Sequence, residues 1–130
     1  MNTVLLVDAD VIVRNQLAEF LRDCGLRVVE ASSAAEARTF LAEASLAIDV
    51  VLIDARLPGA ETAFALRAFV AQAHPEADVL LAGSLDKAVD HASDLCEDAP
   101  DLPKPYDPKS VLDRIRRLQA ERDRGAEDEG

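Results

Sequence analysis

Three aspartates and a lysine are the side chains of this sequence best placed to do chemistry together. Asp8 and Asp54 each stand directly behind a short apolar run, Asp10 lies two residues beyond Asp8, and Lys104 follows a weaker apolar segment near the end of the chain. Carboxylate oxygens are the ligands that hard divalent cations prefer, and a lysine ammonium supplies a compact positive charge. Groups so far apart in the sequence can act together only if the fold brings them to one place.

Short apolar runs that alternate with amphipathic segments supply the elements that could do this. A strand buried on both faces is typically a continuous apolar run, whereas a surface helix repeats its apolar residues every third or fourth position. These patterns predict strands at Thr3–Val7, Leu26–Ala31, Ile48–Ile53 and Val79–Ala82, and a weaker strand at about Ala99–Pro103. They predict helices between Asp10 and Gly25, from Ser33 to about Ala44, from about Glu61 to Gln72, from Asp86 to Cys96, and from Asp107 to about Ala120.

Capping residues support several of these helix ends. Asp10 stands where an N-cap is expected, and Gly25 closes the same helix. Ser33 and Glu36 form a capping-box pattern, and Asp107 precedes a proline in the first turn of the last helix. The caps therefore agree with the boundaries that the apolar pattern predicts.

Strands that alternate with helices indicate an α/β fold. We predict a three-layer, doubly wound, five-stranded parallel sheet with five flanking helices, joined by right-handed crossovers. Ligands of such sheets bind at the carboxyl ends of the strands, so Asp8, Asp54 and Lys104 should meet at one edge of the sheet. We expect residues 1–120 to form this domain and residues 121–130, which lack an apolar face, to form an acidic, disordered tail.

Composition excludes several classes of protein. The 14 basic and 25 acidic residues give a net charge of −11, which would repel a nucleic-acid backbone, so we expect no nucleic-acid binding. The two cysteines are far apart and form no CxxC pair, which disfavours a disulfide framework or a zinc site. No signal-peptide pattern or membrane-length apolar run is present, so we expect a cytoplasmic protein without a membrane segment.

Three segments of the chain resemble the signatures of bacterial response-regulator receiver domains. LLVDAD, VLIDARLPG and LPKPYDP occur in the order and at the spacing of that family, and the likeness covers roughly residues 1–120. The resemblance implies the flavodoxin-like sheet with strand order 2-1-3-4-5. Because the likeness covers most of the chain, we expect a stand-alone receiver that has no output domain of its own.

The resemblance assigns roles to individual residues. An aspartate at the Asp54 position accepts a phosphoryl group from a histidine kinase or a phosphotransfer protein, and a lysine at the Lys104 position neutralises the phosphoryl charge. Asp8, Asp54 and the backbone carbonyl of Arg56 would bind Mg²⁺. Phosphoryl transfer depends mainly on positioning and charge neutralisation, which explains these residue types. Such a protein is not an enzyme beyond catalysing its own phosphorylation and dephosphorylation.

The predicted Mg²⁺ site departs from the family pattern. Receivers carry consecutive acids at the end of the first strand, whereas here Asp8 is followed by Ala9. An alanine side chain cannot ligate a cation, so we expect weak Mg²⁺ binding. Asp10 could reach the site as a substitute ligand, but we favour its simpler role as an N-cap.

The positions that transmit phosphorylation also depart from the pattern. Counting back from Lys104 places Ala82 where receivers carry threonine or serine, and Ser84 would reach the site only through a shifted loop. The aromatic switch residue, three positions before the lysine, is Asp101 here. We therefore expect a partly degenerate site whose phosphorylation is slow, weakly dependent on Mg²⁺, or uncoupled from a conformational change.

Three functional hypotheses follow. The first is a receiver phosphorylated on Asp54 that contacts a downstream protein through its fourth helix, fifth strand and fifth helix, as a monomer or weak dimer. The second is a phosphorylation-independent pseudo-receiver, an adaptor that acts by protein–protein contact; Ala9, Ala82 and Asp101 support it. The third, an unrelated flavodoxin-like enzyme or nucleotide binder, is disfavoured because no Gly-rich phosphate loop follows the first strand.

Overall fold

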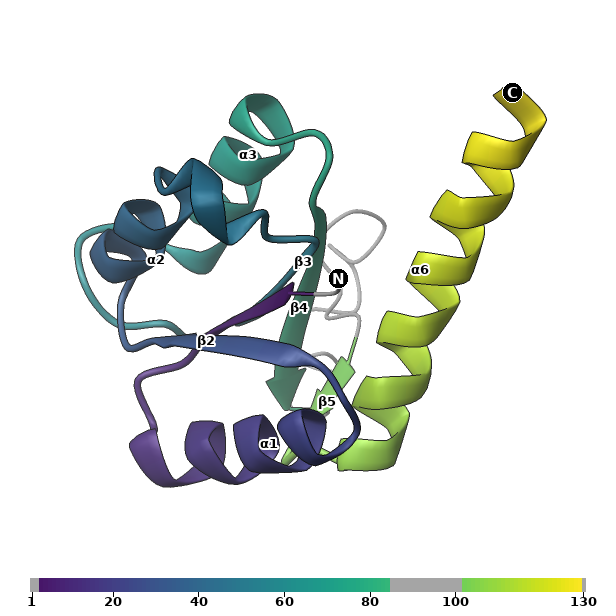
Figure 1. Ribbon diagram of the computed structural model, residues 1–130. Helices are drawn as coiled ribbons and strands as arrows, with labels where there is room; N and C mark the ends of the chain where they lie inside the picture. The colour runs from purple at the N-terminus through teal and green to yellow at the C-terminus, as the bar shows by residue number, and fades with distance from the viewer. Residues whose placement is uncertain (1–2, 85–101, 130) are drawn as a thin grey trace, which may run out of the picture.

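A five-stranded parallel sheet lies at the centre of the computed structural model, which describes residues 3–84 and 102–129 (Figure 1). Its strands run in the order β2-β1-β3-β4-β5, and each neighbouring pair is parallel. The predicted doubly wound sheet and its strand order are therefore confirmed. The strands are β1 (Thr3–Val7), β2 (Arg27–Ala31), β3 (Val50–Asp54), β4 (Asp78–Ser84) and β5 (Leu102–Lys104).

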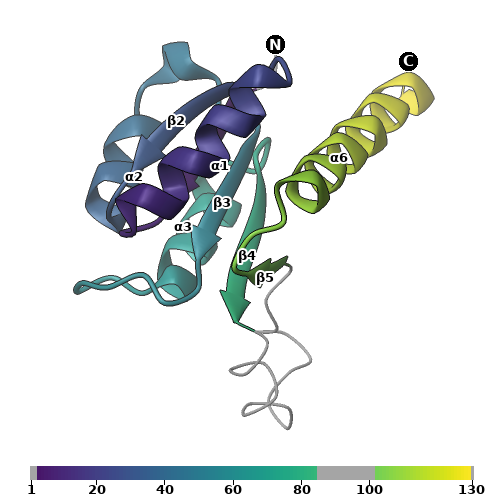
Figure 2. The ribbon, with the colours of Figure 1, turned by 90° about the horizontal axis from the view of Figure 1, so that it is seen from below.

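Helices cover both faces of this sheet. The helices α1 (Val11–Asp23) and α6 (Pro108–Glu129) pack on one face, and α2 (Ala34–Leu41) and α3 (Ala63–Ala73) pack on the other (Figure 2). A short 3₁₀ helix, η1 (Ala44–Leu46), follows α2. The helix predicted at 86–96 lies outside the described residues.

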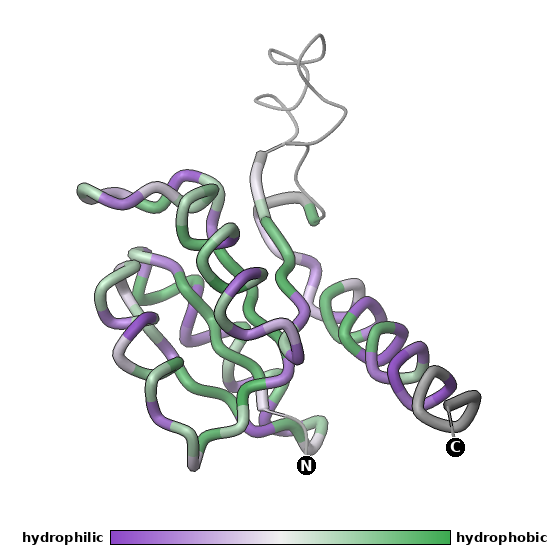
Figure 3. Tube along the Cα trace, turned by 90° about the horizontal axis from the view of Figure 1, so that it is seen from above, coloured by the Kyte–Doolittle hydropathy of each residue, from purple (hydrophilic) through white to green (hydrophobic). Residues whose placement is uncertain are grey.

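Alternation along the strands divides the core into two layers. Every residue of β1 and β3 is buried, which explains why both strands are continuous apolar runs. Leu6 and Leu52 face α1 and α6, whereas Leu5 and Val51 face α2 and α3. Figure 3 shows hydrophobic residues along the central strands and both hydrophilic and hydrophobic residues around the last helix, α6. A parallel sheet of this kind is apolar on both faces, so helices must cover both of them to keep water away.

The caps of the first two helices are those that the sequence predicts. Asp10 Oδ1 accepts the N–H of Val13 at the start of α1, and Ser33 Oγ accepts the N–H of Glu36 at the start of α2. Gly25, with φ of +94°, follows α1 in the left-handed region that favours glycine. Local side-chain chemistry therefore determines these ends.

Helix α2 is shorter than predicted. It ends at Leu41 instead of about Ala44, and the chain then forms η1 and turns at Ala47, where φ is +48°. The residues after Leu41 have a helix-compatible composition, which caused the overestimate. The turn is imposed by the fold because Ile48, which is 8% exposed, must enter the core on the way to β3.

Helix α6 is longer than predicted. It continues through Glu129 instead of ending near Ala120. Arg122 Nε lies 2.6 Å from Asp78 Oδ2, at the first residue of β4, and Arg122 Nη2 donates to the carbonyl of Pro75 at 3.5 Å. These contacts attach the polar end of the helix to the sheet, an interaction that no apolar pattern could reveal. The division of the chain at residue 120 stays a prediction.

No helix among the described residues is both long enough and apolar enough to cross a membrane.

Replacing Arg122 by alanine should loosen the end of α6. The Arg122–Asp78 pair is partly exposed, so we expect a loss of about 0.2–1 kcal/mol in the free energy of unfolding. Hydrogen–deuterium exchange should become faster after Leu118 and stay unchanged in β1 and β3. Arg124→Ala, at an exposed position of the same helix, is the control. Equal exchange in the two variants would contradict a specific role for Arg122.

Candidate functional site

Two buried aspartates lie at the carboxyl ends of the two central strands. Asp8 directly follows β1 and is 2% exposed, and Asp54 is the last residue of β3 and is 8% exposed. The strands are parallel neighbours, with Val7 in register with Ile53, so both acids stand at the same edge of the sheet. The fold therefore brings together two residues that are far apart in the sequence.

Hydrogen-bond donors reach both carboxylate oxygens of Asp8. Its Oδ1 accepts the backbone N–H of Asp10 at 2.9 Å, and its Oδ2 accepts the hydroxyl of Tyr106 at 3.4 Å. The Asp8 main chain is held as well, because its N–H donates to the carbonyl of Ala31 at 3.0 Å. A buried carboxylate is stable only when such donors replace the water that it has lost.

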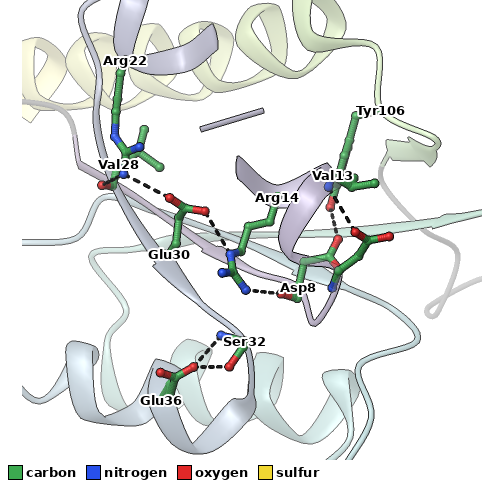
Figure 4. A network of polar contacts seen from close by, with 10 residues as sticks. Asp8, Val13, Arg14, Arg22, Val28, Glu30, Ser32, Glu36 and Tyr106 are labelled. Atoms are coloured by element: carbon green, nitrogen blue, oxygen red, sulfur yellow. Dashed lines mark hydrogen bonds and ion pairs between the residues drawn. The ribbon is translucent and has the colours of Figure 1, made fainter. Parts of the chain in front are cut away.

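A network of charged residues fixes the backbone at Asp8 (Figure 4). Arg14 Nη1 donates to the carbonyl of Asp8 at 2.7 Å, while its Nε contacts Glu30 Oε1 at 3.0 Å. Glu30 also accepts from Arg22 at 3.3 Å, and Arg22 donates to the carbonyl of Val28 at 3.0 Å. The network joins helix α1 to the end of β2 and thereby positions the acid that lies between them.

The Asp54 carboxylate is held by the turn that follows it. Its Oδ1 accepts the N–H of Arg56 at 3.1 Å, and its carbonyl accepts the N–H of Leu57 at 3.0 Å. Asp54 is in register with Ala82 on β4, and the N–H of Ala55 donates to the carbonyl of Ala82 at 2.7 Å. Asp54 therefore has a fixed position between β1 and β4.

The loop after Asp54 is attached to helix α2. Arg38 donates from Nε and Nη2 to the two carboxylate oxygens of Glu61, each at 2.7 Å, and its guanidinium lies 3.8 Å from the centre of the Phe69 ring. This ion pair lowers the pKa of Glu61, mainly because the Arg38 side chain donates to it. A planar, bidentate pair of this kind fixes orientation better than a lysine would.

Tyr106 brings a phenol into the acidic site from the segment between β5 and α6. Its ring is partly buried against the core beneath α1 and α6, and Figure 4 shows its hydroxyl directed at Asp8. The pKa of Tyr106 is raised, first by burial, then by the charges of Asp8 and Asp54, and then by its hydrogen bond to Asp8. The phenol is thus close enough to both carboxylates to feel their charge.

The backbone of Lys104 completes this edge of the sheet. Lys104 ends β5 in register with Ser84, the last residue of β4. Ser84 therefore belongs to a strand that runs two residues beyond Ala82, not to a loop as the sequence suggested. The side chains of Ser84 and Lys104, and the whole of Asp101, lie outside the described residues.

Comparison with protein families decides what kind of domain this is. A model of the response regulator receiver domain matches residues 4–116. The chain belongs to the receiver domain family. A comparison with curated protein sequences gave no match.

Solved receiver structures share this fold at low sequence identity. The receiver domain of NtrX from Brucella abortus is 25% identical with a TM-score of 0.75, covering 88% of this chain and 96% of that chain. The chemotaxis response regulator CheY4 of Vibrio cholerae is 23% identical with a TM-score of 0.74, covering 91% and 98% respectively. A receiver domain protein from Clostridium thermocellum is 19% identical with a TM-score of 0.78, covering 95% and 98%. At these identities the likeness speaks for the fold alone.

Receiver domains generally bind Mg²⁺ at the phosphorylation site, and the donors of this receiver do not fit that role well. Ala9 is exposed and has no side-chain oxygen, and Asp10 Oδ1 caps helix α1, the role that we favoured for it. One oxygen of Asp8 and one of Asp54 already accept backbone N–H groups. Within residues 3–84 and 102–129, no three acidic, histidine or cysteine side chains gather as a metal site.

Sequence reasoning missed two residues of this site. Tyr106 stands in the LPKPYDP segment, and its polar hydroxyl beside a site predicted to be acidic was the available signal. Arg14 lies one helical turn after Asp10, so it could have been expected near the same edge. Neither contact follows from spacing alone, because each joins elements that meet only in the fold.

The raised pKa of Tyr106 predicts a simple optical result. Tyr106 is the single tyrosine of the chain, so phenolate absorbance reports on it alone. The folded chain should keep this phenol protonated above pH ~10, where an unfolded tyrosine ionises. The protonated phenol therefore makes its full contribution to the free energy of unfolding below that pH, and this contribution falls as the pH rises further. Asp8→Asn should move the Tyr106 pKa towards its ordinary value. Phenolate absorbance that appears at pH ~10 in the folded parent would contradict a raised pKa.

Replacing Arg14 should destabilise the domain more than replacing a comparable surface arginine. Arg14→Met removes a donor from the Asp8 carbonyl and one partner from Glu30, whose side chain is 18% exposed. We expect a loss of about 1–3 kcal/mol in the free energy of unfolding, measured by urea denaturation. Arg27→Met, at an exposed position of β2, is the control. A loss no larger than that of the control would show that Arg14 does not position Asp8.

Proposed function

We propose that this receiver domain accepts a phosphoryl group on Asp54 and passes the signal to a partner protein. The observation that most supports the proposal is the placement of Asp54, whose carboxylate ends β3 at the functional edge of a receiver fold. Its neighbour Asp8 adds a second acid at that edge. The Arg56 N–H, in the turn that follows, donates to Asp54 Oδ1 and holds the carboxylate in one orientation.

The reaction needs little covalent chemistry from the protein. A carboxylate oxygen of Asp54 attacks the phosphorus of a phosphohistidine, and an acyl phosphate forms as the phosphorus–nitrogen bond breaks. The imidazole nitrogen keeps the bonding electron pair and takes a proton from solvent. The remaining contribution is positioning and neutralisation of the phosphoryl charge, and we assign the second task to Lys104.

The proposed partners are those of the family. Receiver domains interact with histidine kinases or phosphotransfer proteins and with downstream effectors. We propose a histidine kinase or a phosphotransfer protein as the donor, and a cytoplasmic location for this receiver. For the effector we propose the face to which β5 and α6 contribute, together with the segment predicted as the fourth helix. The expectations of no nucleic-acid partner and of a monomer or weak dimer belong to the same proposal.

A pseudo-receiver adaptor is the second candidate, and two observations favour it. Ala82 is fully buried in register with Asp54, so no side-chain hydroxyl comes from that position. Asp8 already receives two hydrogen bonds from protein donors, and Ala9 adds no oxygen beside it. A chain with these features could keep the fold for protein contact alone.

Phosphorylation with a small-molecule phosphodonor separates these two functions. The full chain is incubated with the donor, with and without Mg²⁺, and its intact mass is measured over time. We expect one added phosphoryl group on the parent, none on Asp54→Asn, and faster addition to Ala9→Asp, because a second acid restores an oxygen ligand.

Each other result has a definite meaning. An adduct on Ala9→Asp but not on the parent would reject the switch and support the adaptor. Equal labelling of Asp54→Asn would show that another residue is the acceptor. Circular dichroism of each variant checks that the fold is kept.

A further inference from the structure

We propose that Tyr106 sets the cation affinity of this site, because its hydroxyl gives Asp8 the stabilisation that a divalent cation would otherwise supply. The inference rests on the proposed function, since it concerns the same acidic edge of the sheet. It deepens that function by naming the residue that makes the site of this receiver independent of a tightly held cation.

The contacts of Asp8 are the first support. Donors reach both carboxylate oxygens, the Asp10 N–H at 2.9 Å and the Tyr106 hydroxyl at 3.4 Å. Arg14 holds the carbonyl of the same residue at 2.7 Å, which fixes the backbone from which the carboxylate extends. Asp8 is therefore a buried acid whose two carboxylate oxygens both accept hydrogen bonds from the protein.

Electrostatics explains why the hydroxyl and a cation would compete. The positive end of the phenol O–H bond points at Asp8 Oδ2, so a cation near that oxygen would repel the hydroxyl hydrogen. Cation binding would require the partly buried hydroxyl to turn away and lose its hydrogen bond to Asp8. Losing such a bond to a charged acceptor carries a free-energy cost.

The missing second acid increases the influence of Tyr106. With Ala9 in place of an acid, one carboxylate fewer stands beside Asp8, so the hydroxyl acts on a larger share of the oxygens that a cation could use. A phenylalanine at position 106 could fill the same place beside the core but would leave Asp8 without the hydroxyl. The hydroxyl of Tyr106, and not its ring, is thus the group that we assign to the cation affinity.

The chain carries its own optical probe for the test. It has a single tyrosine and no tryptophan, so emission excited in the tyrosine absorption band, where phenylalanine does not absorb, comes from Tyr106 alone. Mg²⁺ is titrated into the full chain, without a phosphodonor and at constant ionic strength set with KCl. Binding is followed by calorimetry for every variant and by tyrosine emission for the parent.

We expect Tyr106→Phe to bind Mg²⁺ roughly threefold to tenfold more tightly than the parent, as the removal of one competing hydrogen bond predicts. Emission of the parent should change with the same midpoint as the calorimetric signal. Thr39→Ala, which removes an exposed hydroxyl on α2 away from the site, should match the parent. Asp8→Asn should abolish the binding.

Equal or weaker binding by Tyr106→Phe would overturn the proposal, and so would an absence of measurable binding in that variant. Parent emission that stays constant while calorimetry reports binding would overturn it too, because the hydroxyl would then not have left Asp8. None of these measurements uses phosphorylation. A parent that takes no phosphoryl group therefore rejects the proposed function and leaves the role of Tyr106 intact.

Discussion

Burial of the Asp8 carboxylate is the constraint on which the rest of the site depends. At 2% exposure the acid has lost nearly all of its water, and the free-energy cost of that loss must be offset by hydrogen bonds. The donors come from the turn after β1 and from Tyr106 near the end of the chain, while Arg14 on α1 holds the backbone. One buried charge thus ties the first helix, the second strand and the last segment to the same point.

The same arrangement links the site to helix α6. Tyr106 lies immediately before α6, whose first residue is Pro108. At its far end the helix is attached to the opposite edge of the sheet, where Arg122 pairs with Asp78 at the start of β4. The helix therefore runs from the edge of the sheet where the strands end to the edge where they begin, with Ile115 fully buried between the two. A change in the Tyr106 contact would act directly on the start of this helix.

The fold and the chemistry of this receiver have separate requirements. The fold needs the two-sided apolar core and the caps, and all of these are present. Phosphoryl chemistry needs particular polar groups at the edge, where Asp54 supplies a carboxylate but Ala9 and Ala82 bring no side-chain oxygen. Because a few side chains decide the chemistry while many decide the fold, membership of a family does not by itself establish the activity.

The sequence by itself determined the strand pattern and the caps at Asp10 and Ser33, because these depend on periodicity and on contacts a few residues apart. The strand order followed only from the resemblance of three motifs to those of receiver domains. The sequence also indicated that Asp8 and Asp54 would share an edge, since parallel strands end together. Only the tertiary structure decided that α2 ends at Leu41, that α6 continues through Glu129, and that Tyr106 and Arg14 converge on Asp8. Those outcomes depend on contacts between residues as far apart as 98 positions in the sequence. The residues around one partner of such a contact do not predict which distant residue it will meet.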